Sequence, residues 1–315
     1  MNSGTHIDNV AIGKKVLVFG VLCATSIPIW WHALVITYGL ALANDGYTHI
    51  LLIFPLSTAL IYVDAKWIGW TALQVKQEFS PRLGTTLLVL ALLVGCCARW
   101  VMGGVSEDAR ASVAMFGLVS WWIASVVLCF GVKTLELFLF PLCFLFLMIP
   151  IPAATLSWMI EFLQHESALA AKIMFRVAGV RATQDGIMLF IPNLTIEVAR
   201  ECSSIRSSLM LVITSMVLVH LFLRSWWRKL LVVALAVPLS IAKNGFRIFV
   251  IAELGTKVDP SYFNGNLHHH GGIVFFGLSV IVMAALIWMV RKTEVPADGA
   301  SSLPAELKFD VSTHR

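Results

Sequence analysis

Charged side chains are scarce in this sequence, and apolar side chains are in excess. Asp, Glu, Lys and Arg make up 13% of the 315 residues, against roughly 25% in a soluble domain, and hydrophobic residues reach 58%. This composition excludes an ordinary soluble domain, because so much apolar surface needs lipid around it. We therefore expect the lipid bilayer as a partner and no nucleic acid, and we attribute the net charge of +5 to membrane topology.

The six cysteines lack the spacing of a metal or redox motif. No CxxC pair and no Cys/His ligand spacing is present, so the sequence supports neither a zinc ribbon nor a redox dithiol. Only Cys202 has polar neighbours. The other five lie in apolar runs, where a thiol behaves as a small hydrophobe. They are Cys23, Cys96, Cys97, Cys129 and Cys143.

Strand-like alternation is missing from the long apolar runs. A transmembrane barrel would show alternating segments of about 10 residues, whereas these runs are continuous. Since a helix needs about 20 apolar residues to cross a bilayer, we predict an all-α, polytopic bundle of about eight spans. The first run is too long for a signal-peptide core of roughly 7–15 residues, so we expect it to remain. The predicted spans are residues 16–43, 49–63, 84–102, 113–130, 135–154, 203–223, 230–251 and 272–290.

Lys and Arg gather in alternate connections, which predicts the orientation of the chain. Cytoplasmic loops carry the positive excess, and basic residues precede the first span and follow the second, fourth, sixth and eighth. The opposite connections are acidic, histidine-rich or nearly neutral, apart from the longer stretch 157–202. We therefore predict that both termini are cytoplasmic. Residues 1–292 should form the membrane domain, and residues 293–315 a polar cytoplasmic tail.

The segment before the sixth span has an unusual pattern. An amphipathic stretch at residues 156–177 follows the sequence IPIP and is expected to lie along the membrane interface. Residues 181–199 contain two strand-like runs on either side of Pro192-Asn193, which predicts a small hairpin on the outer face. This hairpin would directly precede Cys202.

Cys202 opens the sixth predicted span within the sequence ECSSIR. A helix N-terminus favours the thiolate, and Arg206, four residues on, would share its helix face and stabilise the thiolate further. Both effects are typical of a nucleophile. The alternative is that Cys202 only fills space and that Arg206 extends to the lipid headgroups.

The seventh span contains cations at membrane depth. Lys243 and Arg247 lie among apolar residues, with Arg247 four or five residues from the predicted outer end and Asn244 on the same face. A charge inside a span costs at least about 2.5–3.5 kcal/mol, so it usually faces a polar interior and marks function. A structural ion pair of Arg247 with Glu201 or Glu253 remains the alternative.

Three consecutive histidines, His268, His269 and His270, precede the last span. Adjacent helical residues point about 100° apart, so three successive imidazoles cannot reach one metal without an irregular backbone. A metal site is thus weakly supported, and a simple interfacial cluster is a further alternative.

Taken together, three helices would deliver a thiol, a guanidinium and an imidazole to one membrane face. Cysteine with histidine fits nucleophilic acyl transfer, in which the imidazole takes the thiol proton and later protonates the leaving amine. The arginine would stabilise the oxyanion or hold the substrate carbonyl.

These residues resemble the exosortase/archaeosortase family of membrane transpeptidases. The family pattern is a cysteine in A-C-S-G-[IL]-R, an arginine in N-x-x-R and a histidine shortly before the last span. Cys202, Arg247 and His268 match it in order and spacing. The similarity extends to YTH at residues 47–49 and to IPIP at residues 149–152, and it covers most of residues 40–290.

The sequence departs from the family pattern at three positions. Glu201 replaces the alanine, Ser204 replaces the glycine, and Ile50 stands where a glycine often follows the tyrosine segment, which suggests a divergent subfamily. Among the histidines we favour His268, because the family histidine commonly precedes a glycine by four and Gly272 fits that spacing.

The resemblance implies an enzyme that cleaves secreted proteins near a C-terminal sorting signal made of a short motif, a transmembrane helix and a basic cluster. PEP-CTERM-type proteins would be the substrates, and the protein would then be transferred to a lipid or polysaccharide acceptor. No metal and no soluble cofactor are implied. The host would be an exopolysaccharide-producing bacterium, with the enzyme in its inner membrane and the active site on the periplasmic face.

Two other classes of function remain open from the sequence. A transporter or channel would line an anion or proton path with the buried cations. An assembly factor for exopolysaccharide export would need no nucleophile at all.

Overall fold

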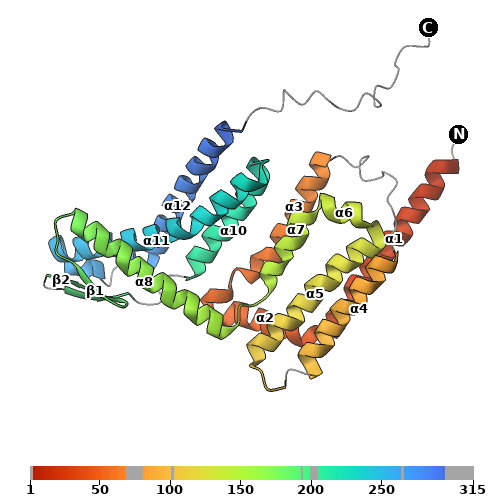
Figure 1. Cartoon of the computed structure of the whole chain (residues 1–315), viewed down its shortest axis with the longest axis horizontal. Helices are drawn as coiled ribbons and strands as arrows, with labels where there is room; N and C mark the ends of the chain where they lie inside the picture. Colours follow the sequence, from red (N-terminus) through yellow and green to blue (C-terminus); the bar gives the residue numbers. More distant parts are fainter. Residues whose placement is uncertain are drawn as a thin grey trace, which may run out of the picture.

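The computed structural model describes residues 3–68, 81–100, 103–192, 194–198, 205–263 and 266–294 (Figure 1). The described chain is mainly helical, with one small sheet. The helices are α1 (Ser3–Ile29), α2 (Trp31–Ala43), η1 (Asp45–Tyr47), α3 (Ile50–Ile68), α4 (Pro81–Trp100), α5 (Glu107–Phe130), α6 (Val132–Leu137), α7 (Leu139–Phe144), η3 (Leu145–Met148), α8 (Ala153–Val177), α10 (Ile205–Phe222), α11 (Trp226–Lys257), η4 (Pro260–Phe263) and α12 (Asn266–Lys292).

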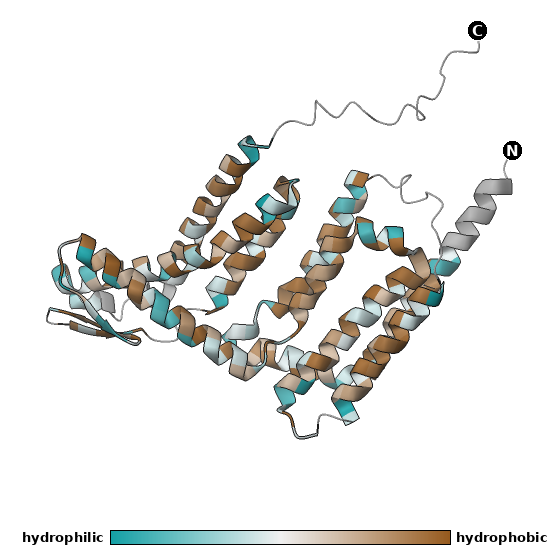
Figure 2. Cartoon of the chain, viewed as in Figure 1, coloured by the Kyte–Doolittle hydropathy of each residue, from teal (hydrophilic) through white to brown (hydrophobic). Residues whose placement is uncertain are grey.

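Helix length and composition confirm the all-α polytopic class. Six helices are long and apolar enough to cross a membrane, and the number rises to eight if each of two bent helix pairs is one span. Figure 2 shows apolar residues along the outer sides of these helices. The apolar windows of α4 and α12 are only 22% buried inside the protein, so most of their surface is free to contact lipid. The chain is a multi-pass membrane protein.

Two predicted spans are not continuous helices. The first is broken at Trp30, where α1 and α2 meet at 75°, and Pro28 in the last turn of α1 weakens the helix there. The fifth consists of the short helices α6, α7 and η3, followed by a bend of 96° into α8. This bend turns α8 across the bundle, as expected of a helix lying along the interface (Figure 1).

Helix ends with nearby basic residues lie together at one end of the molecule, as the charge pattern predicted. The C-terminal ends of α3 and α12 and the turn between α10 and α11 lie at one end of the molecule, and the sheet lies at the other (Figure 1). Basic residues are found at or near the first set of ends. The side of the membrane that each end faces remains a prediction from these charges.

Small residues allow some helices to pack very closely. A Cβ added to Gly84 of α4 would lie 2.7 Å from the Cα atom of Leu128 in α5, so glycine is required for this approach. The N-terminal and C-terminal helices meet through a half-buried polar contact, in which His220 Nε2 of α10 lies 3.1 Å from an Asp64 oxygen of α3. The His220 ring also stacks on Phe140 of α7 at 4.1 Å.

The predicted hairpin is confirmed, with one additional strand. Strands β1 (Thr183–Asp185), β2 (Met188–Ile191) and β3 (Leu194–Glu197) form an antiparallel sheet in the order β1-β2-β3. Gly186, with φ +57°, makes the turn that the sequence pattern did not indicate. The sheet is held by a buried cluster that joins it to α8 and α11. This cluster consists of Ala168, Ala171, Phe175, Ala182, Leu189, Val198, Ile248 and Ala252.

Candidate functional site

The residues expected to carry the chemistry differ in how far the structure describes them. Cys202 lies outside the described residues. Arg247 and Asn244 lie in α11, and Arg206 is in the first turn of α10. The backbone of residues 268–270 belongs to the first turns of α12, but the side chains of the three histidines lie outside the described part.

The polar face of α11 is buried in the protein. Lys243, Asn244 and Arg247 are all buried, and Arg247 is only 7% exposed. Burial of two cations in adjacent turns of a membrane helix is costly, so these residues are expected to face polar groups of the bundle interior. The described contacts of Lys243 agree with this expectation, because its Nζ donates a hydrogen bond to Ser207 Oγ of α10.

Polar contacts fix the register of α10 against α11. Ser240 Oγ of α11 donates to Ser208 Oγ of α10 at 2.7 Å, and Lys243 reaches Ser207, so the two helices run antiparallel with these turns level. Arg247 lies one further turn along α11, a rise of about 6 Å, toward the end where α10 begins. Arg247 is therefore directed to the level at which the chain enters α10.

The segment after the first span packs against the start of α10. Tyr47 Oη donates to the backbone oxygen of Ile151 at 2.7 Å, which ties the YTH segment to the IPIP segment. Asp45 of η1 forms an ion pair with Arg206 at 3.1 Å. A buried apolar cluster joins the same elements. It consists of Ala41, Tyr47, Ile50, Leu156, Leu163 and Ile205.

The chain that leads to Cys202 is anchored at Val198, which is fully buried. The Val198 N–H donates to the backbone oxygen of Ile187 at 3.0 Å, and its oxygen accepts a hydrogen bond from Gln164 Nε2 of α8 at 2.6 Å. With Ile205 packed against η1 on the other side, both flanks of the segment that contains Cys202 are fixed to the protein.

Helix α8 packs very closely against α11, and it also contacts the sheet. A Cβ added to Gly245 would lie 2.6 Å from Ala170 Cβ and 2.9 Å from the backbone nitrogen of Ala171. The two helix backbones can therefore approach this closely only because residue 245 has no side chain. Gly245 lies between Asn244 and Arg247, so this packing also sets the position of the polar face.

The structure gives two ion pairs and one helix boundary that bear on the sequence expectations. Arg206 pairs with Asp45, and this pair is exposed, with side chains 55% and 80% accessible. Glu253 pairs with Lys257, its neighbour one turn along α11. Glu201, the other partner considered for Arg247, lies outside the described residues. Helix α11 continues beyond the predicted end of the seventh span to Lys257, so Arg247 lies ten residues before the end of the helix.

The histidines begin α12 instead of only preceding it. Helix α12 starts two residues before His268. The ring centroids of Phe246 in α11 and Phe275 in α12 are 6.0 Å apart, so these two positions lie side by side. His268 is seven residues before Phe275, about 10 Å along the helix axis. The histidine segment therefore lies farther toward the sheet end than Arg247 does.

Sequence reasoning missed two positions that the structure brings to the site. Gln164 is a polar residue on the buried face of an amphipathic helix, and this mismatch was the available signal. Ser207 contacts Lys243, but a serine in a span carries no distinctive signal by itself. Among the described residues, no group of three or more His, Cys, Asp or Glu side chains could hold a metal ion.

A family model described as transmembrane exosortase matches residues 30–285. The chain belongs to the transmembrane exosortase family. The match begins at Trp30, where α1 and α2 meet, and includes η1, α8, the sheet, α10, α11 and most of α12. Membership in the exosortases supports a membrane transpeptidase-type function and the processing of proteins that carry a sorting signal. A search of curated proteins and a search of solved structures each gave no match.

Proposed function

We propose that this exosortase is a cysteine transpeptidase that cleaves the C-terminal sorting signal of exported proteins at the outer face of a bacterial inner membrane. Cys202 is the nucleophile, Arg247 stabilises the developing oxyanion, and His268 transfers the proton. Asn244 supports Arg247 from the same helix face. The cleaved protein passes to a lipid or polysaccharide acceptor.

The observation that carries this proposal is the position of Arg247. The contacts of Ser240 and Lys243 with α10 set the helix register, and Arg247 continues that face toward the chain that enters α10. Three peptide units separate Cys202 from Ile205, a reach of at most roughly 11 Å. This reach supports our proposal that the Cys202 thiol lies at the same end of the helix pair as the buried Arg247 guanidinium.

In the proposed reaction, His268 removes the proton from the Cys202 thiol, and the sulfur attacks the carbonyl carbon of the scissile peptide bond. The carbonyl oxygen becomes an oxyanion, which the Arg247 guanidinium stabilises by charge-assisted hydrogen bonds. The imidazolium returns its proton to the leaving amine as the C–N bond breaks. The resulting thioester is then attacked by the acceptor nucleophile, and the thiol is released.

The role of Arg206 is revised within this proposal. Its guanidinium is engaged with Asp45 on η1, so it contributes less to the thiolate than its sequence position suggested. We assign it to holding η1 against the start of α10. The substrate's own helix would present the scissile bond at this end of the bundle, where α8 and the two residues that flank the Cys202 segment, Val198 and Ile205, are found.

The test is a processing assay in cells that express the full chain with a tagged substrate ending in a motif, a hydrophobic helix and a basic cluster. Cys202→Ala and Cys202→Ser should abolish cleavage, whereas Cys143→Ala, which removes another free cysteine, should not. Retained cleavage in Cys202→Ser or Cys202→Ala would show that Cys202 is not the nucleophile. A thioester intermediate should be trapped with Cys202 intact, and its consistent absence would favour an assembly factor.

The arginine and histidine have separate tests. Arg247→Ala should abolish cleavage and Arg247→Lys should restore it poorly, since an ammonium lacks the planar fork of the guanidinium. Arg176→Ala, at an exposed position of α8, is the matched control. His268→Ala should reduce cleavage more than His269→Ala, and the reverse ranking would assign the proton transfer to another ring.

A further inference from the structure

A cavity of about 410 Å³ lies at the break between α1 and α2, where these helices face α4 and α5. It is separate from the polar face of α11 and from the sheet, and none of the residues proposed for transpeptidation lines it. Pockets of this size hold small molecules or parts of larger ones. The side chains around it indicate which chemistry it accepts.

One hydrogen-bond donor in the cavity wall has no partner among the described residues. Trp30 is only 3% exposed, and its indole Nε1 makes no described hydrogen bond. Gly95 of α4 and Gly117 of α5 let the indole nitrogen pack closely between these helices, because Cβ atoms there would lie 2.8 Å and 3.3 Å from it. A buried N–H without an acceptor is costly, so this position favours a ligand that brings an acceptor oxygen.

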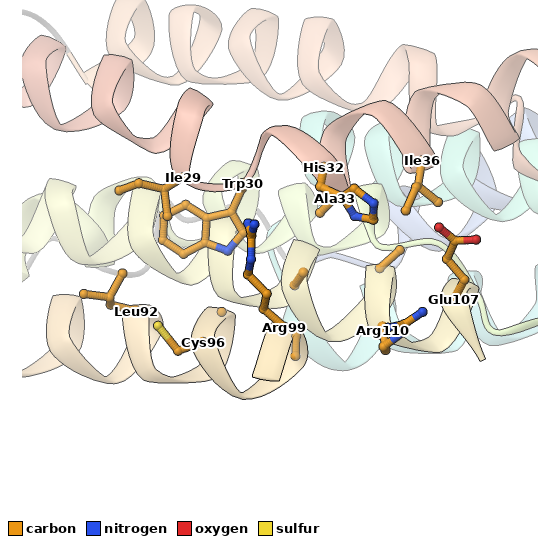
Figure 3. Close-up of a pocket in the computed structure, with 14 residues that line it drawn as sticks. Ile29, Trp30, His32, Ala33, Ile36, Leu92, Cys96, Arg99, Glu107 and Arg110 are labelled. Atoms are coloured by element: carbon orange, nitrogen blue, oxygen red, sulfur yellow. The ribbon is translucent and has the colours of Figure 1, made fainter. Parts of the chain in front are cut away.

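The charged side chains of the cavity are mainly cationic. Arg99 of α4 and Arg110 of α5 line it with His32 of α2 and a single acid, Glu107. Among the described residues, neither arginine forms an ion pair, and Arg110 Nε is buried without a hydrogen-bond partner. Figure 3 shows the Arg99 side chain extending from α4 toward Trp30 at the helix break. Guanidinium groups donate only, and their fork geometry matches phosphate.

The rest of the cavity wall is apolar and continues onto a lipid-facing surface. Ile29 and Leu92 line the cavity and are also substantially exposed on the outside of the bundle, at 44% and 37%. The α4 window that contains Leu92 is mostly unburied, and the large hydrophobic residues next to it, Val89, Leu90 and Leu93, are exposed. Figure 2 shows the apolar character of this helix. A ligand at this position would therefore have an anionic group between the arginines and hydrocarbon along α1 and α4.

We propose that this cavity binds the phosphate headgroup of an anionic phospholipid, with the acyl chains against the exposed faces of α1 and α4. The two arginines and the Trp30 indole donate hydrogen bonds to the phosphate oxygens. This inference is independent of the transpeptidase proposal, since it uses no residue of that mechanism. It assigns a lipid site to the region where the first span is broken.

Native mass spectrometry of the full chain in detergent tests the proposal. Phosphatidylglycerol should form a defined one-to-one adduct at lower concentration than phosphatidylcholine of the same chain length. The Arg99→Gln/Arg110→Gln double variant should bind phosphatidylglycerol at least about tenfold more weakly. Arg82→Gln, at an exposed position at the opposite end of α4, should bind as the unchanged protein does.

The controls separate the possible sources of the anion. Excess inorganic phosphate should not displace the lipid, because the hydrocarbon contacts are part of the site. Complete displacement by phosphate would overturn the lipid assignment and indicate a site for free anions. Trp30→Phe keeps an aromatic ring but removes the N–H together with part of the indole, so it should weaken lipid binding even if the double variant fails to fold. Unchanged affinity in Trp30→Phe, or in a folded double variant, would refute the proposal.

Discussion

Replacing Gly245 with alanine should force α11 away from α8. The added Cβ would lie 2.6 Å from Ala170 Cβ, and two atoms of the neighbouring backbone lie within 3.1 Å of it. Because these neighbours are backbone atoms and a methyl group, no flexible side chain can move aside. The helices themselves must separate by about 0.8 Å to reach 3.4 Å, the short end of ordinary van der Waals contact.

Two consequences follow from this displacement. Overpacking of a close helix contact typically costs about 1–3 kcal/mol of stability. The same movement shifts α8, which carries Gln164 and its 2.6 Å hydrogen bond to the Val198 oxygen before the nucleophile segment. A misplacement of about 1 Å can cost about 100-fold in rate, so we expect processing to fall between about tenfold and 100-fold.

The assay combines thermal unfolding of purified protein in detergent with cleavage of a tagged sorting-signal substrate in cells. Gly277→Ala in α12 is the matched control, because a Cβ there meets no atom within 4 Å. Alanine is favoured over glycine in a helix by up to about 1 kcal/mol, so this control should be neutral or slightly stabilised. If Gly245→Ala unfolds at the same temperature as Gly277→Ala and cleaves normally, the close packing of α8 on α11 does not position the site.

Three further substitutions test the anchors around the nucleophile segment. Gln164→Leu leaves the buried oxygen of Val198 without its donor, so it should lower stability by about 1–3 kcal/mol and reduce cleavage, as measured by thermal unfolding and the processing assay. Tyr47→Phe removes the hydrogen bond to the Ile151 oxygen and should cost a similar amount of stability with a smaller loss of cleavage. Arg206→Gln breaks an exposed ion pair and should change stability by less than about 1 kcal/mol. Equal losses of stability in all three variants would contradict the expectation that the two hydrogen bonds contribute more than the exposed ion pair.

Matched changes keep these results interpretable. Gln184→Leu removes a half-buried amide of β1 that donates to the His165 and Gly186 oxygens and not to Val198, so it controls for the loss of a glutamine elsewhere. Tyr62→Phe alters a tyrosine at an exposed position of α3. Neither change should affect cleavage. A loss of cleavage in Arg206→Gln with unchanged stability would return Arg206 to a direct role beside the thiolate.

Hydrophobic runs predicted the number of spans but not their breaks. A run such as residues 16–43 is apolar throughout, and the bend at Trp30 depends on how α4 and α5 pack against it with small residues at their contact. The hairpin was predicted from two strand-like runs, while β1 was missed because its three residues carry little pattern. Local preference is weak over such a short segment, and pairing with β2 determines the strand.

The sequence indicated candidate residues for the site but not the contacts that surround them. Residue type and spacing singled out Cys202, Arg247 and the histidines, since charged and nucleophilic residues are conspicuous in apolar spans. The contacts of Gln164 with Val198, Tyr47 with Ile151 and Asp45 with Arg206 join residues between 34 and 161 positions apart in the sequence. Nothing local to either partner specifies such a contact.

The sequence by itself determined that this protein is a multi-pass helical membrane protein, because the apolar excess and the length of its runs leave no soluble alternative. It also singled out the candidate residues for the proposed acyl-transfer chemistry. Only the tertiary structure decided the position of the polar face of α11 and of Val198: the register of α10 on α11 directs Arg247 to the start of α10, and Gly245 lets α8, which carries the Gln164 contact to Val198, approach α11 closely. Helix register and backbone separation arise from contacts between distant parts of the chain, and for that reason composition and spacing cannot specify them.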